Sequence, residues 1–373
     1  MARPVKRLIL AALCLAVLVG GAVAMIRIND TGNMLYKRYK ESDPYVFETL
    51  RPELALQDAS EFLTINDAAE LRNRRTALAR LVYGSSADRV AASYHRFSVP
   101  SALWDAAQTL SGLKGASRFY VEPGPGVLSF FYLLTPEVPQ AGKALIYHHG
   151  FAGDFMQADG FLERMLAEGY TIVAFNQLGY GENSREVQCP GSIDPACEIN
   201  LQFGLRELEN GLAYHVEPVR AGIDLLQFLG FDRIDAVGFS AGSATVALAA
   251  ALDDRITRSV AAAGILPYYL REGQDAPIGI AEYPPLRELV GMMDLFLLGA
   301  AGDGRAQMHL FNRFDRCCFR NVKGRAYEPA LTRRLSDLGA GGAFTVRVDE
   351  THARHKISDW GADQIVSFLA APS

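Results

Sequence analysis

Short apolar runs alternate with longer segments of helical periodicity from about residue 116 to the C-terminus. The runs have the length and composition of strands that are buried on both faces of a sheet. They lie at 144–147, 171–175, 234–239, 259–263, 308–311 and 344–348, and a Pro-Gly-Pro-Gly turn joins two earlier strand-like runs at 118–121 and 127–134. A hairpin followed by strand–helix alternation predicts an α/β sheet covered by helices on both faces. Reactive groups in such sheets gather at the carboxyl ends of the strands.

The pentapeptide GFSAG at 238–242 follows one of these runs and precedes a helix-like segment. A G-x-S-x-G sequence in this context is typical of a nucleophile elbow, a sharp turn that exposes the serine Oγ. Gly238 and Gly242 are expected there because a side chain at either position would collide with the neighbouring strand or helix. The pattern predicts that Ser240 is a nucleophile.

A second glycine-containing turn, HGFAG at 149–153, ends an earlier strand-like run. The turn at Gly150 leaves backbone N–H groups free to point at a developing oxyanion. We expect the N–H groups of Phe151 and Ala241 to form the oxyanion hole, and the N-terminus of the helix after Ser240 adds a favourable dipole to the second of them.

A nucleophilic serine needs a general base, and the base needs an acid that orients it. The chain order Ser–acid–His leaves three histidines after Ser240, namely His309, His352 and His355. His309 lies within an apolar run and is expected in the core. His355 is favoured as the base because it stands just before Ser358, a good N-cap for the last helix, and His352 is the alternative.

The acid should follow the strand-like run that ends near residue 312. Asp315 does so within the sequence FDR at 314–316. Asp349 and Glu350 are nearer to His355 in the sequence, but they end the last strand-like run and have the pattern of ordinary strand-end charges. Asp315 is therefore the predicted acid.

Together these motifs resemble the α/β-hydrolase superfamily. The resemblance rests on HGFAG, GFSAG, FDR and the terminal ARHKIS at 353–358, and NQLGYGENS at 176–184 also resembles a family turn, although its frequent Asp-x-Arg-Gly pattern is replaced by NQLG. It implies a mostly parallel sheet of eight strands in a catalytic domain at 116–373. It also implies hydrolysis of an ester, amide or thioester through an acyl-enzyme, with no metal or organic cofactor. Serine at the elbow argues against haloalkane dehalogenation, which requires Asp there, and against dienelactone hydrolysis, which requires Cys.

Residues 1–28 have the features of a signal peptide or of a single transmembrane anchor. Three positive charges in MARPVKR precede the 19 uncharged residues Leu8–Ile26. Cleavage after Ala24 would release an exported protein, whereas an uncleaved helix would keep the catalytic domain anchored outside the cytoplasm. The apolar run continues past the cleavage motif, which favours the anchor.

Two further segments lie outside the motifs. Residues 29–115 are predicted to form a polar-amphipathic helical extension without a chemical motif. Residues 266–304 lie where hydrolases of this kind often carry a lid. An apolar lid would suit a lipid ester, but we favour ordinary helices that pack on the sheet.

Four cysteines lie in the body of the chain. Cys189 and Cys197 bracket the loop CPGSIDPAC, which favours a local disulfide in an oxidising compartment. Cys317 and Cys318 are adjacent, a strained arrangement for pairing with each other. No CxxC or HxxxH spacing accompanies them, so no metal site is predicted.

Composition excludes other function classes. The chain carries 37 Lys+Arg against 42 Asp+Glu, which argues against nucleic-acid binding, and its 49% hydrophobic residues exclude a disordered chain. The leading interpretation is a carboxylesterase that acts on a small-molecule or lipid ester and contacts a membrane through its N-terminal segment. An amidase or peptidase of the same fold, and a non-catalytic binding protein, are the alternatives.

Overall fold

The computed structural model describes residues 3–84, 93–189, 198–201, 210–273 and 282–371, together with positions 193, 204, 208 and 280. The main sheet contains β1 (His95–Arg96), β2 (Leu113–Gly124), β3 (Val127–Pro136), β4 (Ala144–His148), β5 (Thr171–Phe175), β8 (Ile234–Phe239), β9 (Ile256–Ala262), β10 (Ala306–Asn312) and β11 (Ala343–Asp349). A separate small hairpin consists of β6 (Glu186–Gln188) and β7 (Glu198–Asn200).

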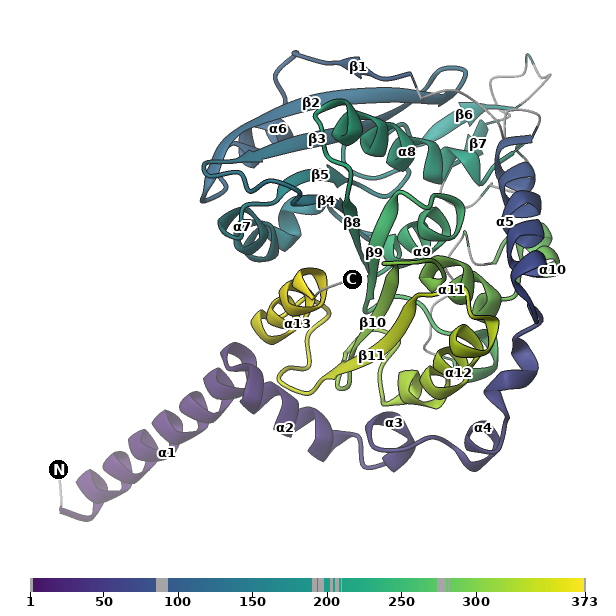
Figure 1. The fold of residues 1–373 in the computed structure, drawn as a ribbon. Coiled ribbons are helices and arrows are strands. Elements are labelled where there is room, and N and C mark those ends of the chain that lie inside the picture. The colour runs from purple at the N-terminus through teal and green to yellow at the C-terminus, as the bar shows by residue number, and fades with distance from the viewer. Residues whose placement is uncertain are drawn as a thin grey trace.

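Helices cover both faces of this sheet, and one of them, α1, projects away from it (Figure 1). They are α1 (Arg3–Ile28), α2 (Asp30–Lys40), α3 (Pro44–Phe47), α4 (Pro52–Ala55), α5 (Ala68–Tyr83), α6 (Ala102–Ala107), α7 (Asp159–Ala167), α8 (Ala213–Phe228), α9 (Gly242–Leu252), α10 (Pro284–Leu289), α11 (Met292–Ala300), α12 (Glu328–Leu338) and α13 (Asp359–Ala370). Short 3₁₀ segments lie at η1 (Ala59–Phe62), η3 (Phe155–Ala158), η5 (Tyr268–Leu270) and η6 (Lys323–Ala326).

The strand order is β1-β2-β3-β5-β4-β8-β9-β10-β11. The six strands β5, β4, β8, β9, β10 and β11 run parallel to one another. The strands β1, β2 and β3 are joined to them by antiparallel pairing. The predicted mostly parallel α/β sheet is confirmed. The described sheet has nine strands instead of the eight that the resemblance implied, because the two-residue strand β1 extends the edge beside β2.

Buried apolar side chains cover both faces of the sheet. On β4, Ile146 belongs to the cluster that also contains residues of α5, α8, α9, α11 and α12, whereas Leu145 and Tyr147 belong to the cluster with residues of α6, α7 and α13. Successive side chains of a strand point to opposite faces, so a continuous apolar run fits this double burial. All five residues of β4 are buried accordingly.

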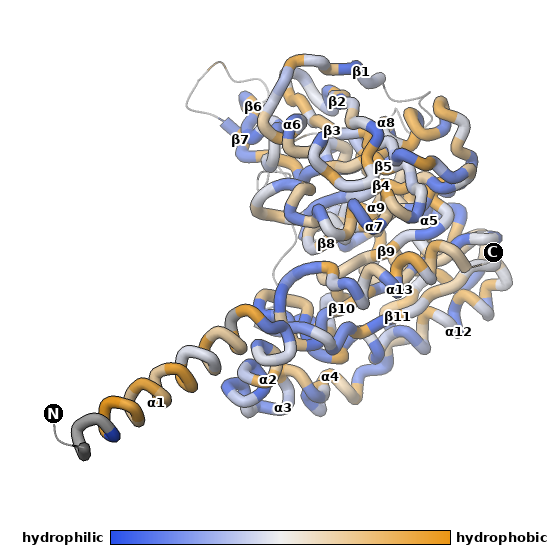
Figure 2. The backbone as a smooth tube through the Cα atoms, turned by 90° about the vertical axis from the view of Figure 1, so that its left-hand side faces the viewer, coloured by the Kyte–Doolittle hydropathy of each residue, from blue (hydrophilic) through white to orange (hydrophobic). Residues whose placement is uncertain are grey.

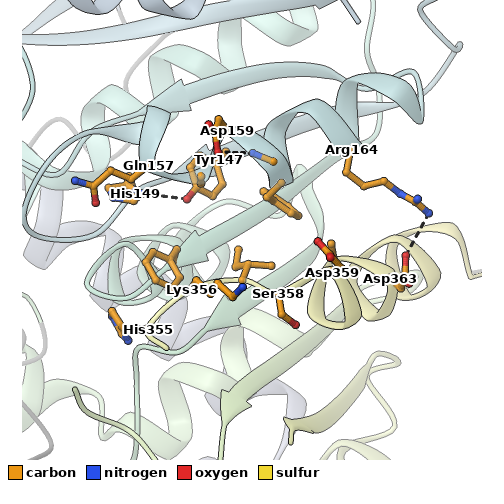
Figure 3. Close-up of a pocket in the computed structure, with 16 residues that line it drawn as sticks. Tyr147, His149, Gln157, Asp159, Arg164, His355, Lys356, Ser358, Asp359 and Asp363 are labelled. Atoms are coloured by element: carbon orange, nitrogen blue, oxygen red, sulfur yellow. Dashed lines mark hydrogen bonds and ion pairs between the residues drawn. The ribbon is translucent and has the colours of Figure 1, made fainter. Parts of the chain in front are cut away.

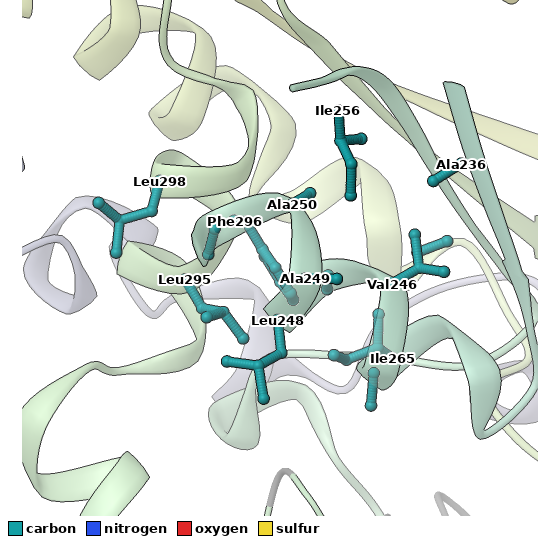
Figure 4. Close-up of a cluster of buried hydrophobic side chains, with 14 of the residues drawn as sticks. Ala236, Val246, Leu248, Ala249, Ala250, Ile256, Ile265, Leu295, Phe296 and Leu298 are labelled. Atoms are coloured by element: carbon teal, nitrogen blue, oxygen red, sulfur yellow. The ribbon is translucent and has the colours of Figure 1, made fainter. Parts of the chain in front are cut away.

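The helix α11 lies within the segment for which a lid was considered, and all nine of its residues are buried. Leu295 and Phe296 pack beside Leu248 and Ala249 of α9 in the core (Figure 4). This helix is therefore part of the core, and a lid remains a prediction only for the residues that precede it.

The stretch predicted as a helical extension runs along the outside of the body, from α2 near the loop after β11 to α5 beside α10 (Figure 1). Asp294, which is buried in α11, accepts hydrogen bonds from the backbone N–H groups of Thr64 and Ile65 at 2.9 and 3.3 Å. Arg75 of α5 donates to the carbonyl of Leu298 at 2.8 Å. These contacts attach the N-terminal stretch to the core of the sheet domain.

The helix α1 projects away from the body, and its apolar residues stand out in Figure 2. Within the described residues it is the one helix long and apolar enough to cross a membrane, at Arg7–Ile26 with a mean hydropathy of 2.7 and none of that segment buried. A signal sequence near the N-terminus has the same properties.

Candidate active site

Ser240 lies at the carboxyl end of β8, directly before α9. Its φ of +54° is in the left-handed region, and its side chain is partly accessible. A Cβ atom on Gly238 would overlap the carbonyl of Gly242, and one on Gly242 would overlap the carbonyl of His148. The two glycines are therefore required by close backbone contacts, as the elbow pattern predicts.

The structure brings Ser240, Asp315 and His355 together from three strand ends. His355 Nε2 lies 2.9 Å from Ser240 Oγ, and His355 Nδ1 lies 2.7 Å from Asp315 Oδ2. Asp315 is fully buried, and its other carboxylate oxygen accepts the backbone N–H of Cys317 at 2.7 Å. This geometry suits a serine that donates its proton to a neutral imidazole held by a carboxylate.

The structure places His352, the alternative base, in a different environment. It is buried, and its Nε2 lies 3.3 Å from Asp349 Oδ2. Its Nδ1 accepts the backbone N–H of Arg354 at 3.0 Å. The ring therefore organises the loop between β11 and α13, and among the described residues the ring hydrogen-bonded to Ser240 Oγ is that of His355.

The expectation that Asp349 is an ordinary strand-end charge is wrong. Its side chain is fully buried, and it accepts hydrogen bonds from Thr351 N at 2.8 Å and from the Ser358 hydroxyl. Burial alone would raise its pKa, but the hydrogen bonds from His352, Ser358 and Thr351 outweigh burial and lower it. Asp349 thus holds the loop that carries His355.

The predicted oxyanion turn lies against the nucleophile. A Cβ atom on Gly150 would stand 2.6 Å from the Ser240 Cβ, and Ala152 adopts a left-handed φ of +66°. Among the described residues, no hydrogen bond is formed by the backbone N–H of Phe151 or by that of Ala241, the N-cap of α9. Both donors can therefore serve a ligand beside Ser240.

A cavity of about 430 Å³ opens next to His355, between α7 and α13. One side is formed by residues of β4, η3 and α7, and the other by residues after β11 (Figure 3). The charged or amide side chains on its wall are Gln157, Asp159, Arg164, Lys356, Asp359 and Asp363. Arg164 pairs with Asp363 at 3.3 Å, which links the two sides.

His149 lines the same cavity and lies 3.1 Å from the hydroxyl of Tyr147 through its Nδ1. Burial and the nearby His355 lower the pKa of His149 and a hydrogen bond with Gln157 raises it, with a net pKa of about 4. The ring is therefore neutral near pH 7 and adds no positive charge beside His355.

The prediction for one of the two cysteine pairs is wrong. Cys317 and Cys318 form a disulfide with each other, although their adjacency was expected to disfavour it. The left-handed φ of +54° at Phe319 shows that the chain turns directly after the pair. Cys189 is disulfide-bonded, but its predicted partner Cys197 lies outside the described residues, so this pairing stays a prediction.

Sequence reasoning did not identify the residues that support Asp315. Asn312 Nδ2 donates to Asp315 Oδ2 at 3.3 Å and to the carbonyl of Lys356 at 2.9 Å. It thereby joins the acid loop to the histidine loop. Its position at the carboxyl end of β10 was the available signal, because polar groups at that edge can reach the site.

Acidification should destabilise the fold because burial lowers the pKa of four histidines. Burial lowers the pKa of His148 and His149 to about 4, and that of His215 and His309 to about 3. The unfolded side chain titrates near pH 6.5, so below that pH the unfolded chain binds protons that the folded chain excludes. Stability should be greatest above about pH 6.5 and fall by up to about 1.4 kcal/mol per pH unit per histidine as the pH drops toward 4.

Thermal unfolding measured between about pH 7.5 and 5 tests this sign. Among the described residues, neither ring nitrogen of His215 has a hydrogen-bond partner, so His215→Leu should reduce the slope. His95→Gln is the matched control, since His95 is exposed. A wild-type profile that is flat over this range would contradict the prediction.

Comparisons with known proteins are consistent with this geometry. The family model described as "alpha/beta hydrolase fold" matches residues 143–299, which include Ser240 and the turn at Gly150. None of the curated proteins matches the sequence.

Solved structures are similar over most of the chain. Methylesterase BT1017 is 17% identical, with a TM-score of 0.54, over 87% of this chain and 69% of that one. A glucuronoyl esterase from Solibacter usitatus is 14% identical, with a TM-score of 0.52, over 87% of this chain and 98% of that one. At these identities the likeness concerns the fold.

Proposed function

We propose that this chain, which has the α/β-hydrolase fold, is a serine hydrolase that cleaves a carboxylic ester through an acyl-enzyme. The observation that carries the proposal is the position of the His355 ring, with Nε2 2.9 Å from Ser240 Oγ and Nδ1 2.7 Å from Asp315 Oδ2. In this proposal the catalytic domain is the predicted span 116–373 together with β1 and the first residues of β2, which belong to the same sheet.

In the first half of the reaction, His355 takes the Ser240 proton as Oγ attacks the ester carbonyl carbon. Asp315 holds the ring with Nε2 facing the serine and stabilises the imidazolium that forms. The N–H groups of Phe151 and Ala241 donate to the tetrahedral oxyanion, each contributing about 3 kcal/mol. Collapse expels the alcohol, which receives its proton from His355.

In the second half, His355 removes a proton from water, and the resulting nucleophile attacks the acyl carbon on Ser240. The second tetrahedral intermediate uses the same two backbone donors. Its collapse releases the carboxylic acid and returns the proton to Ser240 Oγ. The cycle thus uses the three side chains, the two backbone N–H groups and water.

One observation favours an ester over an amide as the substrate, and a second favours a small polar ester over a lipid ester. The proteins of similar structure named above are, by their names, esterases, which supports an ester over an amide. The cavity beside His355 has charged and amide groups such as Asp159, Arg164 and Gln157 on its wall, which suit a polar group better than a long acyl chain. A lipid ester is the alternative that the apolar α1 supports.

The apolar helix α1 also supports the interpretation that the protein is bound to a membrane. We infer that it is kept as a single anchor and that the catalytic domain lies outside the cytoplasm. Release after Ala24 would give an exported form of the same enzyme.

A panel of chromogenic esters and a matched amide tests the proposal on the full-length protein. We expect turnover that is fastest with short acyl groups and at least about 100-fold slower with the matched amide, whose leaving group is poorer. A maximum at long acyl chains would support the lipid ester instead. Absence of turnover of every ester, together with no reaction with a fluorophosphonate probe, would mean that the chain is a non-catalytic binding protein.

A further inference from the structure

The disulfide between Cys317 and Cys318 lies on the loop that presents Asp315 to His355. The backbone N–H of Cys317 donates to Asp315 Oδ1 at 2.7 Å, so the pair is directly connected to the acid. Cys317 is exposed, whereas Cys318 is buried. A reductant in solution can therefore reach the residue that carries one sulfur, whereas the residue that carries the other is buried.

The two sulfurs also lie close to the base. The two Sγ atoms and a ring nitrogen of His355 all lie within 4.8 Å of one another. The ligand atoms of a tetrahedral Zn²⁺ site stand about 3.5 Å apart, given metal–ligand distances of about 2.0–2.3 Å. Small side-chain rotations would bring the three atoms to those separations once the sulfurs are no longer bonded to each other.

We propose that reduction of this disulfide creates a binding site for a thiophilic divalent cation such as Zn²⁺, and that the bound cation switches the enzyme off. The two thiolates of Cys317 and Cys318 and the imidazole of His355 supply three ligands, and water takes the fourth position. Two thiolates and one imidazole are the donors that Zn²⁺ prefers in proteins. The inhibitory part of this inference rests on the proposed function.

The redox step needs a thiol reductant. A thiolate of a small dithiol attacks the sulfur of Cys317, the S–S bond breaks, and Cys318 leaves as a thiolate. The second thiol of the reductant then releases Cys317, and the reductant ends as its own disulfide. The two hydrogens of the dithiol end on the protein sulfurs, and Zn²⁺ later displaces these protons to water.

Metal binding and catalysis exclude each other because both nitrogens of His355 are already engaged. Nε2 faces Ser240 Oγ at 2.9 Å, and Nδ1 faces Asp315 Oδ2 at 2.7 Å. A cation that binds either nitrogen removes the base or its contact with the acid. The disulfide prevents this binding, since sulfurs bonded to each other provide no thiolate ligands.

The test compares four preparations of the full-length protein. Wild type and a Cys317→Ser, Cys318→Ser double variant are each studied oxidised and after reduction with dithiothreitol, which is removed by desalting under nitrogen. The double variant keeps the backbone N–H at 317 and the other cysteines, so it is the matched control for reduction elsewhere. Zn²⁺ stoichiometry, the Co²⁺ absorption spectrum and ester turnover are recorded for each.

We expect only reduced wild type to bind one Zn²⁺ and to give a thiolate-to-Co²⁺ charge-transfer band. Saturating Zn²⁺ should lower its turnover at least about 100-fold, toward that of an enzyme without its base, and a chelator should restore it. Co²⁺ affinity should fall at least about tenfold in reduced His355→Ala, which lacks the third ligand.

Equal Zn²⁺ inhibition of the reduced double variant, or reduced wild type without the thiolate–Co²⁺ band, would overturn the proposal. These outcomes are distinct from failure of the proposed function. If the Co²⁺ band forms but no preparation hydrolyses any ester, the metal site stands and the esterase assignment falls.

Discussion

Replacing Ser240 with alanine is expected to lower kcat for a chromogenic ester by about 10⁶-fold, to the level left by the oxyanion donors and substrate binding. The side chain supplies the atom that bonds to the acyl carbon, and its Oγ is the group within hydrogen-bond distance of His355 Nε2. KM should change little, because the variant keeps the cavity and both backbone donors. Steady-state kinetics of purified variant and wild type measure both constants.

A fluorophosphonate probe provides an independent readout of the same residue. It should form a covalent adduct with wild-type protein that peptide mass mapping assigns to Ser240, and it should leave Ser240→Ala unlabelled. Since Ser240 has a φ of +54°, alanine introduces no larger side chain at this strained position, and the variant should keep the thermal stability of wild type within a few degrees. Undiminished labelling of the folded variant would show that another residue is the nucleophile.

The sheet could be predicted from the sequence because double burial produces continuous apolar runs. The run at 144–147 became β4, whose side chains enter both core clusters, and the run at 234–239 became β8. The edge strand β1 could not be predicted, because it has two residues and both are exposed. Its pairing with β2 depends on tertiary contacts and not on a hydrophobic pattern.

The residues of the candidate site could be predicted because each one follows a strand that the sequence pattern had predicted. Ser240, Asp315 and His355 follow β8, β10 and β11, and the chain order limited the choice of partners. The pairing of His352 with Asp349 was not predictable, because local hydrogen bonds within a loop leave no periodic signal.

The proposed metal ligands could not be predicted from the sequence either, because the two cysteines are distant from His355 along the chain. Neither CxxC nor HxxxH spacing marks Cys317 and Cys318, since the third ligand atom belongs to His355 and reaches them only through the fold. Sequence spacing finds metal ligands that share one turn or one helix. It does not find those that meet because two parallel strands end side by side, as β10 and β11 do here.

Replacing His355 with alanine is expected to lower kcat by about 10⁵–10⁶-fold, while His352→Ala should keep kcat within about tenfold of wild type. His355 accepts the serine proton in both halves of the reaction, so its loss leaves Ser240 without a base. His352 is buried beside Asp349, and its loss should instead lower the thermal stability, because Asp349 and the N–H of Arg354 each lose a partner.

Kinetics and thermal unfolding of the two variants therefore separate a chemical role from a structural one. His355→Ala should remain folded at the assay temperature and be almost inactive, and added imidazole should restore part of its activity, since the small base can enter the space left by the ring. His352→Ala should unfold several degrees lower and remain active below that temperature. If only the change at His352 abolished turnover in folded protein, the assignment of His355 as the base would be wrong, although its ring lies 2.9 Å from Ser240 Oγ.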